Sequence, residues 1–235
     1  MKSEKSDWGG LISVRAASEQ LRVSPDHVRD LVRAGDLDAV TPGREVLVTS
    51  ESVARRAASA PAAGRPLTPA NAWAVLWLAS GQTPNWVSSS DLVRVRRFAA
   101  RPLPRWPRML INRAHVHRVR VPDPVLNRVR SLTGVTAGGA AAAASHGSNL
   151  LPGVSEHEFY LTQAALHAVR GVRGVGWRSP SPNVVLRVLP GTLPPDVIAG
   201  VMHDVAVRGM AAADLLDRGD ERSRHAAAEL LGRER

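Results

Sequence analysis

Two closely spaced helix-start signals constrain the fold of the N-terminal part of this chain more than any other feature. Ser13 can cap a helix over residues 14–21, whose apolar side chains recur at helical spacing. Ser24 followed by Pro25 is a capping residue and a first-position proline, and it begins a second helix that Gly35 ends. Because only a short turn separates the two helices, the pattern predicts a helix-turn-helix.

A β-hairpin is expected directly after the second helix. Residues 37–40 and 45–48 alternate apolar and polar side chains around a Pro-Gly turn. Ser50 can cap a further helix that ends near Ala58, before a stretch of small residues. A hairpin in this position is a wing, so the sequence predicts a winged helix-turn-helix domain.

The remainder of the chain mixes helical and strand patterns. Helices are expected from Thr68-Pro69 and from Ser88, and the tail from Pro195 is expected to form two helices. Strand candidates are residues 115–121, 134–137, 158–162 and 183–189. The predicted fold class is therefore α+β, with a winged helix-turn-helix domain over residues 1–60, a linker over 61–66 and a larger mixed α/β domain over 67–235.

The net charge of +10 comes from one middle segment of the chain. Residues 1–60 hold nine basic and nine acidic side chains, whereas residues 61–130 hold twelve arginines against Asp91 and Asp123. Of the 31 basic residues 29 are arginine, whose planar fork suits phosphate, although GC-rich codons favour arginine too. An Arg-rich surface for polyanions is therefore predicted in the first part of the second domain, residues 67–130.

Composition and motifs point away from several classes of protein. The chain has no cysteine, which excludes disulfides, thiolate zinc sites and a cysteine nucleophile. It lacks a signal-peptide pattern and an apolar stretch of membrane-spanning length, so a soluble cytoplasmic protein with no membrane partner is expected. Phosphate-loop, GxSxG and HExxH motifs are absent. We therefore expect no enzyme activity and no cofactor.

Two clusters of metal-ligand residue types have simpler explanations. His115 and His117 share one face of a predicted strand, but neighbouring arginines disfavour a cation. Four aspartates near the C-terminus are better explained by helix capping and by pairing with Arg208, Arg218 and Arg222; they are Asp204, Asp214, Asp217 and Asp220. No metal site is predicted.

The N-terminal segment ISVRAASEQLRVSPDHVRDLVRAGDLDAV resembles the excisionase or MerR-like winged-helix family. In that family the second helix enters the major groove and the wing touches the DNA backbone. The resemblance implies DNA contacts by the following residues of the second helix and the wing tip: Ser24, His27, Arg29, Arg33 and Arg44. Asp26 and Asp30 lie on the same helix and oppose phosphate.

A second resemblance covers roughly residues 65–231. The segments RPLTPANAWAVLWLASG, MLINRAHVHRVRV, NVVLRVLP and GMAAADLLDRGDERSRHAAAELL are similar, in this order, to the AbiEi class of type IV antitoxins. This resemblance implies an antitoxin that represses its own toxin–antitoxin operon and opposes a nucleotidyltransferase toxin. The excisionase-like N-terminus departs from the better-known members of the class.

The two resemblances together give the expected function, a DNA-binding antitoxin and autorepressor associated with the nucleoid. The Arg-rich segment would hold phosphates through Arg94, Arg97, Arg101, Arg105 and Arg108. A homodimer on adjacent half-sites is expected, because one small winged helix offers few contacts. The alternatives are an excisionase-like architectural factor for recombination and a nucleic-acid-processing enzyme that uses Asp204 and Asp214.

Overall fold

The computed structural model describes residues 10–43, 45–58, 65–148, 157–177, 179–205 and 207–233. Its N-terminal module contains β1 (Leu11–Ser13), α1 (Val14–Leu21), α2 (Pro25–Arg33), β2 (Ala39–Val40), β3 (Leu47–Thr49) and α3 (Ser50–Ala58). The three strands form an antiparallel sheet in the order β1-β3-β2. Each element that the sequence predicts in this module is therefore present.

Side-chain caps explain where the helices of the module begin. The hydroxyl of Ser13 accepts the N–H of Ala16 at 3.1 Å, and the hydroxyl of Ser24 accepts the N–H of His27 at 3.2 Å. The predicted cap of α3 is wrong by one residue, because Thr49 and not Ser50 accepts the N–H of Ser52, at 3.2 Å.

The N-terminal module has a hydrophobic core of its own. One face of each helix packs against the sheet, and the buried core residues are Val14, Ala17, Val28, Leu31, Leu37, Val48 and Val53. Burial of these apolar side chains accounts for the stability of such short helices and strands.

The second part of the chain is built on a mixed four-stranded sheet. Its strands are β4 (His115–Val119), β5 (Val135–Ala137), β6 (His157–Leu161) and β7 (Val184–Val188), in the order β4-β7-β6-β5. β6 and β7 are parallel, and the two outer pairs are antiparallel. The whole molecule therefore has the predicted α+β class, with two separate sheets.

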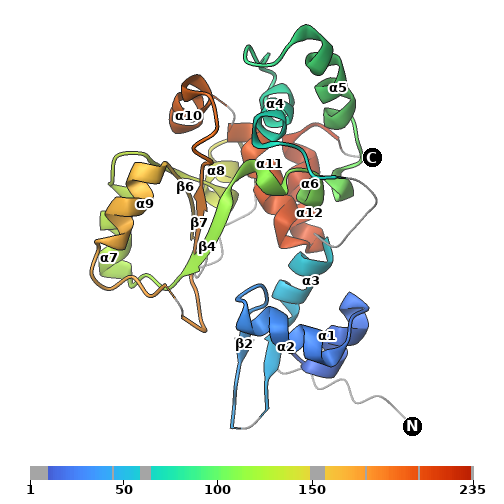
Figure 1. The fold of residues 1–235 in the computed structure, drawn as a ribbon, viewed down its shortest axis with the longest axis vertical. Helices are drawn as coiled ribbons and strands as arrows, with labels where there is room; N and C mark the ends of the chain where they lie inside the picture. The colour runs from blue at the N-terminus through green and yellow to red at the C-terminus, as the bar shows by residue number, and fades with distance from the viewer. Residues whose placement is uncertain are drawn as a thin grey trace.

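Helices cover both faces of this sheet (Figure 1). On one face, Phe159 and Leu161 pack with α7 (Asp123–Arg130) and α9 (Gln163–Arg170). Because side chains alternate along a strand, Tyr160 points to the opposite face and joins the largest core. That core includes α4 (Pro69–Ala79), α5 (Ser89–Ala99), α6 (Trp106–Met109), α8 (Gly139–Ala144), α10 (Pro195–Met202), α11 (Val207–Arg218) and α12 (Glu221–Leu230).

Three tryptophans belong to the largest core and are buried, namely Trp73, Trp77 and Trp106. The segment between α5 and β4 adds two short 3-10 helices, at Leu103–Arg105 and Ile111–Arg113. The prediction of two helices in the tail is wrong, because α10 ends at Met202 and leaves α11 as a separate helix. No helix in the described ranges is long and apolar enough to cross a membrane.

The N-terminal module contacts the second part through α3 and α11. Gly219, just after α11, lies so close to α3 that a Cβ atom there would be 2.7 Å from the carbonyl oxygen of Ala54. Figure 1 shows the module at the lower end of the molecule and α5 at the upper end. This arrangement decides which of the predicted site residues can act together.

Candidate functional site

The outer face of α2 carries most of the DNA contacts that the sequence predicts. Val28 and Leu31 point into the module core, which leaves His27, Arg29 and Arg33 exposed on the other side. The fourth helix residue, Ser24, is exposed as well, although its hydroxyl accepts the backbone N–H of His27. The structure thus brings these four predicted residues onto one helix.

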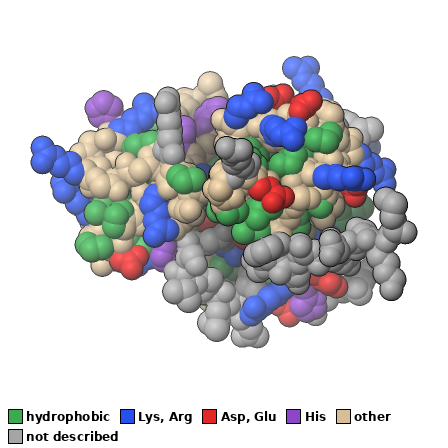
Figure 2. All heavy atoms as spheres, turned by 90° about the horizontal axis from the view of Figure 1, so that it is seen from below, with side chains coloured by type: hydrophobic (Ala, Val, Ile, Leu, Met, Phe, Trp, Pro, Cys, Tyr) green, Lys and Arg blue, Asp and Glu red, His purple; other side chains and the backbone are tan. Residues whose placement is uncertain are grey.

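The arginines of α2 are balanced by acidic residues on the same helix. Arg29 pairs with Asp26 at 2.7 Å and Arg33 pairs with Asp30 at 2.8 Å, each three residues away. Seen from this end of the molecule, Arg and acidic side chains are intermixed (Figure 2). Exposed pairs of this kind contribute about 0–1 kcal/mol, so the arginines can exchange these partners for phosphate or base edges.

The hairpin of β2 and β3 extends from the body of the molecule beside α2 (Figure 1). Gly43 at its turn has a φ of +69°, the left-handed conformation that glycine adopts most easily. The predicted wing-tip contact, Arg44, lies outside the described residues. The hairpin extends at the free end of the module, whereas Arg33 at the end of α2 lines a hollow that β4 of the second part also lines.

The Arg-rich segment begins on α5, at the opposite end of the molecule, and continues through α6 toward the middle (Figure 1). Arg94 pairs with Asp91, and the guanidinium of Arg101 lies 4.6 Å from the centre of the Phe98 ring. Arg97 and Arg105 are exposed as well. The structure therefore does not bring the arginines of α5 beside the outer face of α2.

The last residues of the Arg-rich run differ from those on α5. Arg108 is half-buried, and its Nε atom has no hydrogen-bond partner among the described residues. Arg113, which extends the same run in sequence, is 2% exposed and belongs to the interior of the second part. The positive charge of residues 61–130 is thus divided between a surface helix and the protein interior.

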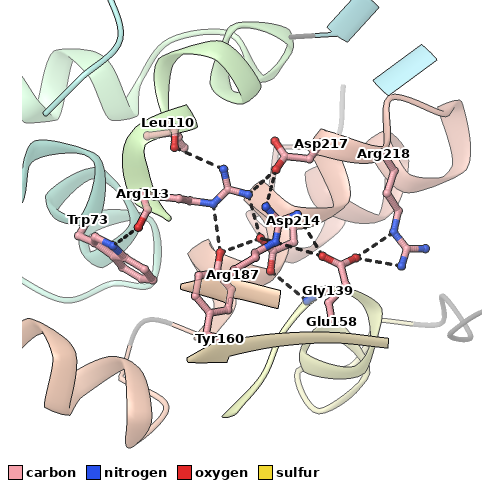
Figure 3. A network of polar contacts seen from close by, with 10 residues as sticks. All are labelled: Trp73, Leu110, Arg113, Gly139, Glu158, Tyr160, Arg187, Asp214, Asp217 and Arg218. Carbon is pink, nitrogen blue, oxygen red and sulfur yellow. Dashed lines mark hydrogen bonds and ion pairs between the residues drawn. The ribbon is translucent and has the colours of Figure 1, made fainter. Parts of the chain in front are cut away.

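Arg113 is part of a buried network of charged residues that the sequence analysis missed (Figure 3). Its guanidinium donates to Asp214 at 2.9 Å and to the hydroxyl of Tyr160 at 3.1 Å. Asp214 also accepts from the Tyr160 hydroxyl at 2.8 Å and from the backbone N–H of Gly139 at 2.9 Å. Asp214 is fully buried, so these donors replace the water that its carboxylate has lost.

The network continues across the sheet to β6 and β7. Arg187 pairs with Glu158 at 3.0 Å and with Asp217 at 2.9 Å. Arg218 pairs with the other oxygen of Glu158 at 3.1 Å, and Asp217 also pairs with Arg113. The described network therefore joins three arginines and three carboxylates from β6, β7, α11 and the turn before β4 (Figure 3).

Burial and pairing act against each other on the carboxylates of the network. Burial alone would raise the pKa of Asp217, but the charges of Arg113 and Arg187 outweigh it and hold that pKa below its usual range. Burial raises the pKa of Glu158 despite the opposing charges of Arg187 and Arg218. Burial also raises the pKa of Tyr160, so its hydroxyl stays protonated and can donate to Asp214.

This network corrects the predicted partners of the C-terminal aspartates. Asp214 and Asp217 pair with Arg113 and Arg187, which are distant in sequence, whereas the predicted partners were the nearby Arg208, Arg218 and Arg222. Asp220 does cap α12, where it accepts the N–H of Ser223 at 2.7 Å. Asp204 is exposed, and its contact with Thr136 at 3.5 Å lies outside the network.

A pair of glycines was the sequence signal that could have indicated the network. A Cβ atom on Gly139 would lie 2.4 Å from a carboxylate oxygen of Glu158, and one on Gly138 would lie 3.1 Å from the Tyr160 ring. Gly139 also has a φ of +57°. Residues 138–148, a stretch rich in glycine and alanine, therefore begin with two residues that fit closely against the network.

The two strand histidines lie away from this network. His117 contacts the ring of Trp177, with a centre-to-centre distance of 5.8 Å. Within the ranges that the structure describes, no group of three or more His, Asp or Glu side chains is placed to hold a metal ion. Comparison with known protein families, with curated proteins and with solved structures found no match to this chain.

Proposed function

We propose that residues 10–58 form a winged helix-turn-helix module that binds double-stranded DNA sequence-specifically. In this proposal α2 enters the major groove and the β2–β3 hairpin lies against the DNA backbone. The observation that carries the proposal is the order β1-α1-α2-β2-β3-α3, together with exposed basic side chains on α2 and a hairpin that extends away from the rest of the molecule. His27, Arg29 and Arg33 would contact base edges and phosphates.

The wider role that we propose is autorepression of a toxin–antitoxin operon at the nucleoid. It is supported by the resemblance of residues 65–231 to AbiEi-class antitoxins, which oppose nucleotidyltransferase toxins. A homodimer would place two modules on adjacent half-sites. The exposed arginines of α5 would then contact phosphates outside the DNA segment that α2 reads, because α5 and the N-terminal module lie at opposite ends of the molecule.

Fluorescence anisotropy with the duplex upstream of the gene and with a scrambled duplex tests the DNA-binding proposal. We expect the natural duplex to bind about a thousandfold more tightly. Arg29→Ala with Arg33→Ala should reduce this preference, whereas Arg15→Ala should not, because Arg15 is an exposed arginine of α1 in a similar ion pair, with Glu19. Equal affinity of the natural protein for both duplexes would overturn the proposal.

Substitution of the acidic residues of α2 gives a second test, in which DNA binding is expected to become tighter. Asp26→Asn with Asp30→Asn frees Arg29 and Arg33 from their ion pairs and removes two negative charges from the proposed interface. We expect tighter binding to both duplexes and a steeper dependence of affinity on salt, because more cations become available to phosphate. An unchanged affinity would show that this face of α2 does not meet DNA.

A further inference from the structure

An open hollow of about 620 Å³ separates the N-terminal module from the edge strand β4 of the second sheet. The module contributes Arg55 and Arg56 from α3, and β4 contributes Arg118. The lining also includes an apolar wall formed by Pro69, Pro107 and Ile111. A second hollow of about 660 Å³ lies beside it, and Arg118 lines both.

Arg118 is a half-buried cation that lines both hollows. Among the residues that the structure describes, no side chain or carbonyl is within hydrogen-bonding or ion-pairing reach of its guanidinium. Its nearest acidic neighbours are committed elsewhere, because Asp38 pairs with Arg55 at 2.6 Å and Asp217 pairs with Arg113 and Arg187. A cation that is partly removed from water without a partner raises the free energy of the folded protein.

The surroundings of Arg118 favour an anion. Burial lowers the pKa of Arg118, and the charge of Arg55 lowers it further, against the weaker opposing charge of Asp38. Arg56 adds another positive charge to the same wall, although it lies 3.8 Å from Asp36. The acidic residues that line the hollow, Asp36 and Asp217, therefore already have arginine partners.

We propose that this hollow binds a small phosphate-bearing molecule with a flat apolar body, of the size and chemistry of a nucleotide. The phosphate would pair with Arg118, and the apolar body would lie against Pro69, Pro107 and Ile111. Arginine is suited to this task because its planar fork donates two parallel hydrogen bonds to phosphate oxygens. The volume lies within the usual range for small-ligand sites, about 300–1,000 Å³.

Occupancy of the hollow has a consequence for the whole molecule. A ligand that contacts both α3 and β4 bridges the N-terminal module and the second sheet. It would stabilise the arrangement in which the module is docked, because it binds that arrangement more tightly than an undocked one. The proposal goes beyond DNA binding and is tested in the absence of DNA, so its failure is distinguishable from failure of the proposed function.

Isothermal titration calorimetry with adenosine monophosphate and with inorganic phosphate tests the site, alongside thermal unfolding. We expect adenosine monophosphate to bind the natural protein and raise its melting temperature, and phosphate to do so more weakly. Arg118→Gln should weaken binding about tenfold or more, because a charge-assisted contact is lost. Arg96→Gln, which removes an exposed arginine of α5, should leave binding unchanged.

The unliganded variants separate a binding role from a structural one. Without ligand, Arg118→Gln should unfold at the same temperature as the natural protein or at a higher one, because the substituted cation has no partner among the described residues. Equal affinity of Arg118→Gln and the natural protein would overturn the site. Failure of both probes to bind the natural protein would also overturn it, and equal binding of phosphate and adenosine monophosphate would refute the role of the apolar wall.

Discussion

At the scale of single residues, Asp214 is the buried carboxylate that connects several segments of the second part. Its two carboxylate oxygens accept hydrogen bonds from Arg113, Tyr160 and Gly139, and Arg187 lies 3.1 Å away. These partners come from four separate segments of the chain. A buried ion pair adds little over a well-packed apolar pair, but the loss of one partner leaves an uncompensated charge in the interior.

Asp214→Asn keeps the size of the side chain and removes its charge, which leaves Arg113 and Arg187 without one of their carboxylates. We expect the free energy of unfolding, measured by urea titration, to fall by about 3–5 kcal/mol. The matched control is Asp204→Asn, since Asp204 is exposed and outside the network. Similar losses in the two variants would contradict the role assigned to the network.

Two histidines of the second sheet should make the folded protein less stable in mild acid. Burial lowers the pKa of His117, and the charge of Arg170 lowers it further. Burial also lowers the pKa of His157, and Arg130 acts in the same direction. The unfolded chain therefore takes up protons on these histidines at a higher pH than the folded protein does. The free energy of unfolding keeps its full value above about pH 6.5, where the histidines are neutral in both states, and decreases as the pH falls below it.

Urea titrations near about pH 7.5 and about pH 5.8 measure this effect, on either side of the ordinary histidine pKa. We expect the free energy of unfolding to fall toward acid, and to fall less in the double variant His117→Gln, His157→Gln. The comparison of the two proteins isolates the histidines from Glu158, whose raised pKa changes stability in the opposite direction. Parallel pH curves for the two proteins would refute the prediction.

At the scale of helices and strands, local sequence signals were sufficient wherever one short segment determines its own structure. The caps at Ser13, Ser24 and Asp220 form as predicted, because a cap depends on residues three positions apart. The α3 cap shows the limit, since Thr49 and Ser50 offer the same hydroxyl and the strand before them decides which one is used. Strand positions followed from alternation, but their order in the sheet required tertiary contacts.

The network was beyond such signals because its members are far apart in sequence. Arg113 and Asp214 are separated by most of the second part, and nothing local distinguishes Arg113 from the exposed arginines before it. The aspartates were therefore assigned to neighbouring arginines in the sequence. The apolar side chains of the tail are buried in the core, as Val197, Val201 and Leu215 show.

At the scale of the whole molecule, the charge of a segment predicted only in part where its charged side chains lie. The basic segment 61–130 does not place all of its arginines on the surface far from the neutral N-terminal segment. Arg113 lies in the interior, and Arg118 lines the hollow next to the N-terminal module. The N-terminal module is joined to the larger second part by the close contact of α3 with the end of α11.

This contact depends on the absence of a side chain at Gly219. A Cβ atom there would lie 2.7 Å from the carbonyl oxygen of Ala54, which is backbone and cannot rotate away, and Gly219 has a φ of +77°. Gly219→Ala should therefore force α3 away from α11, and we expect a larger radius of gyration in small-angle X-ray scattering. The module should remain folded, because its core is separate from the cores of the second part.

Gly81→Ala is the matched control, since Gly81 has a φ of +80° and an added Cβ would meet no atom within 4 Å. Both substitutions carry the strain of a left-handed alanine, about 1–2 kcal/mol, but only the change at Gly219 adds a clash between the two parts. The radius of gyration should thus increase for Gly219→Ala and stay constant for Gly81→Ala. If both variants kept the radius of the natural protein, the contact between α3 and α11 would not be what positions the module.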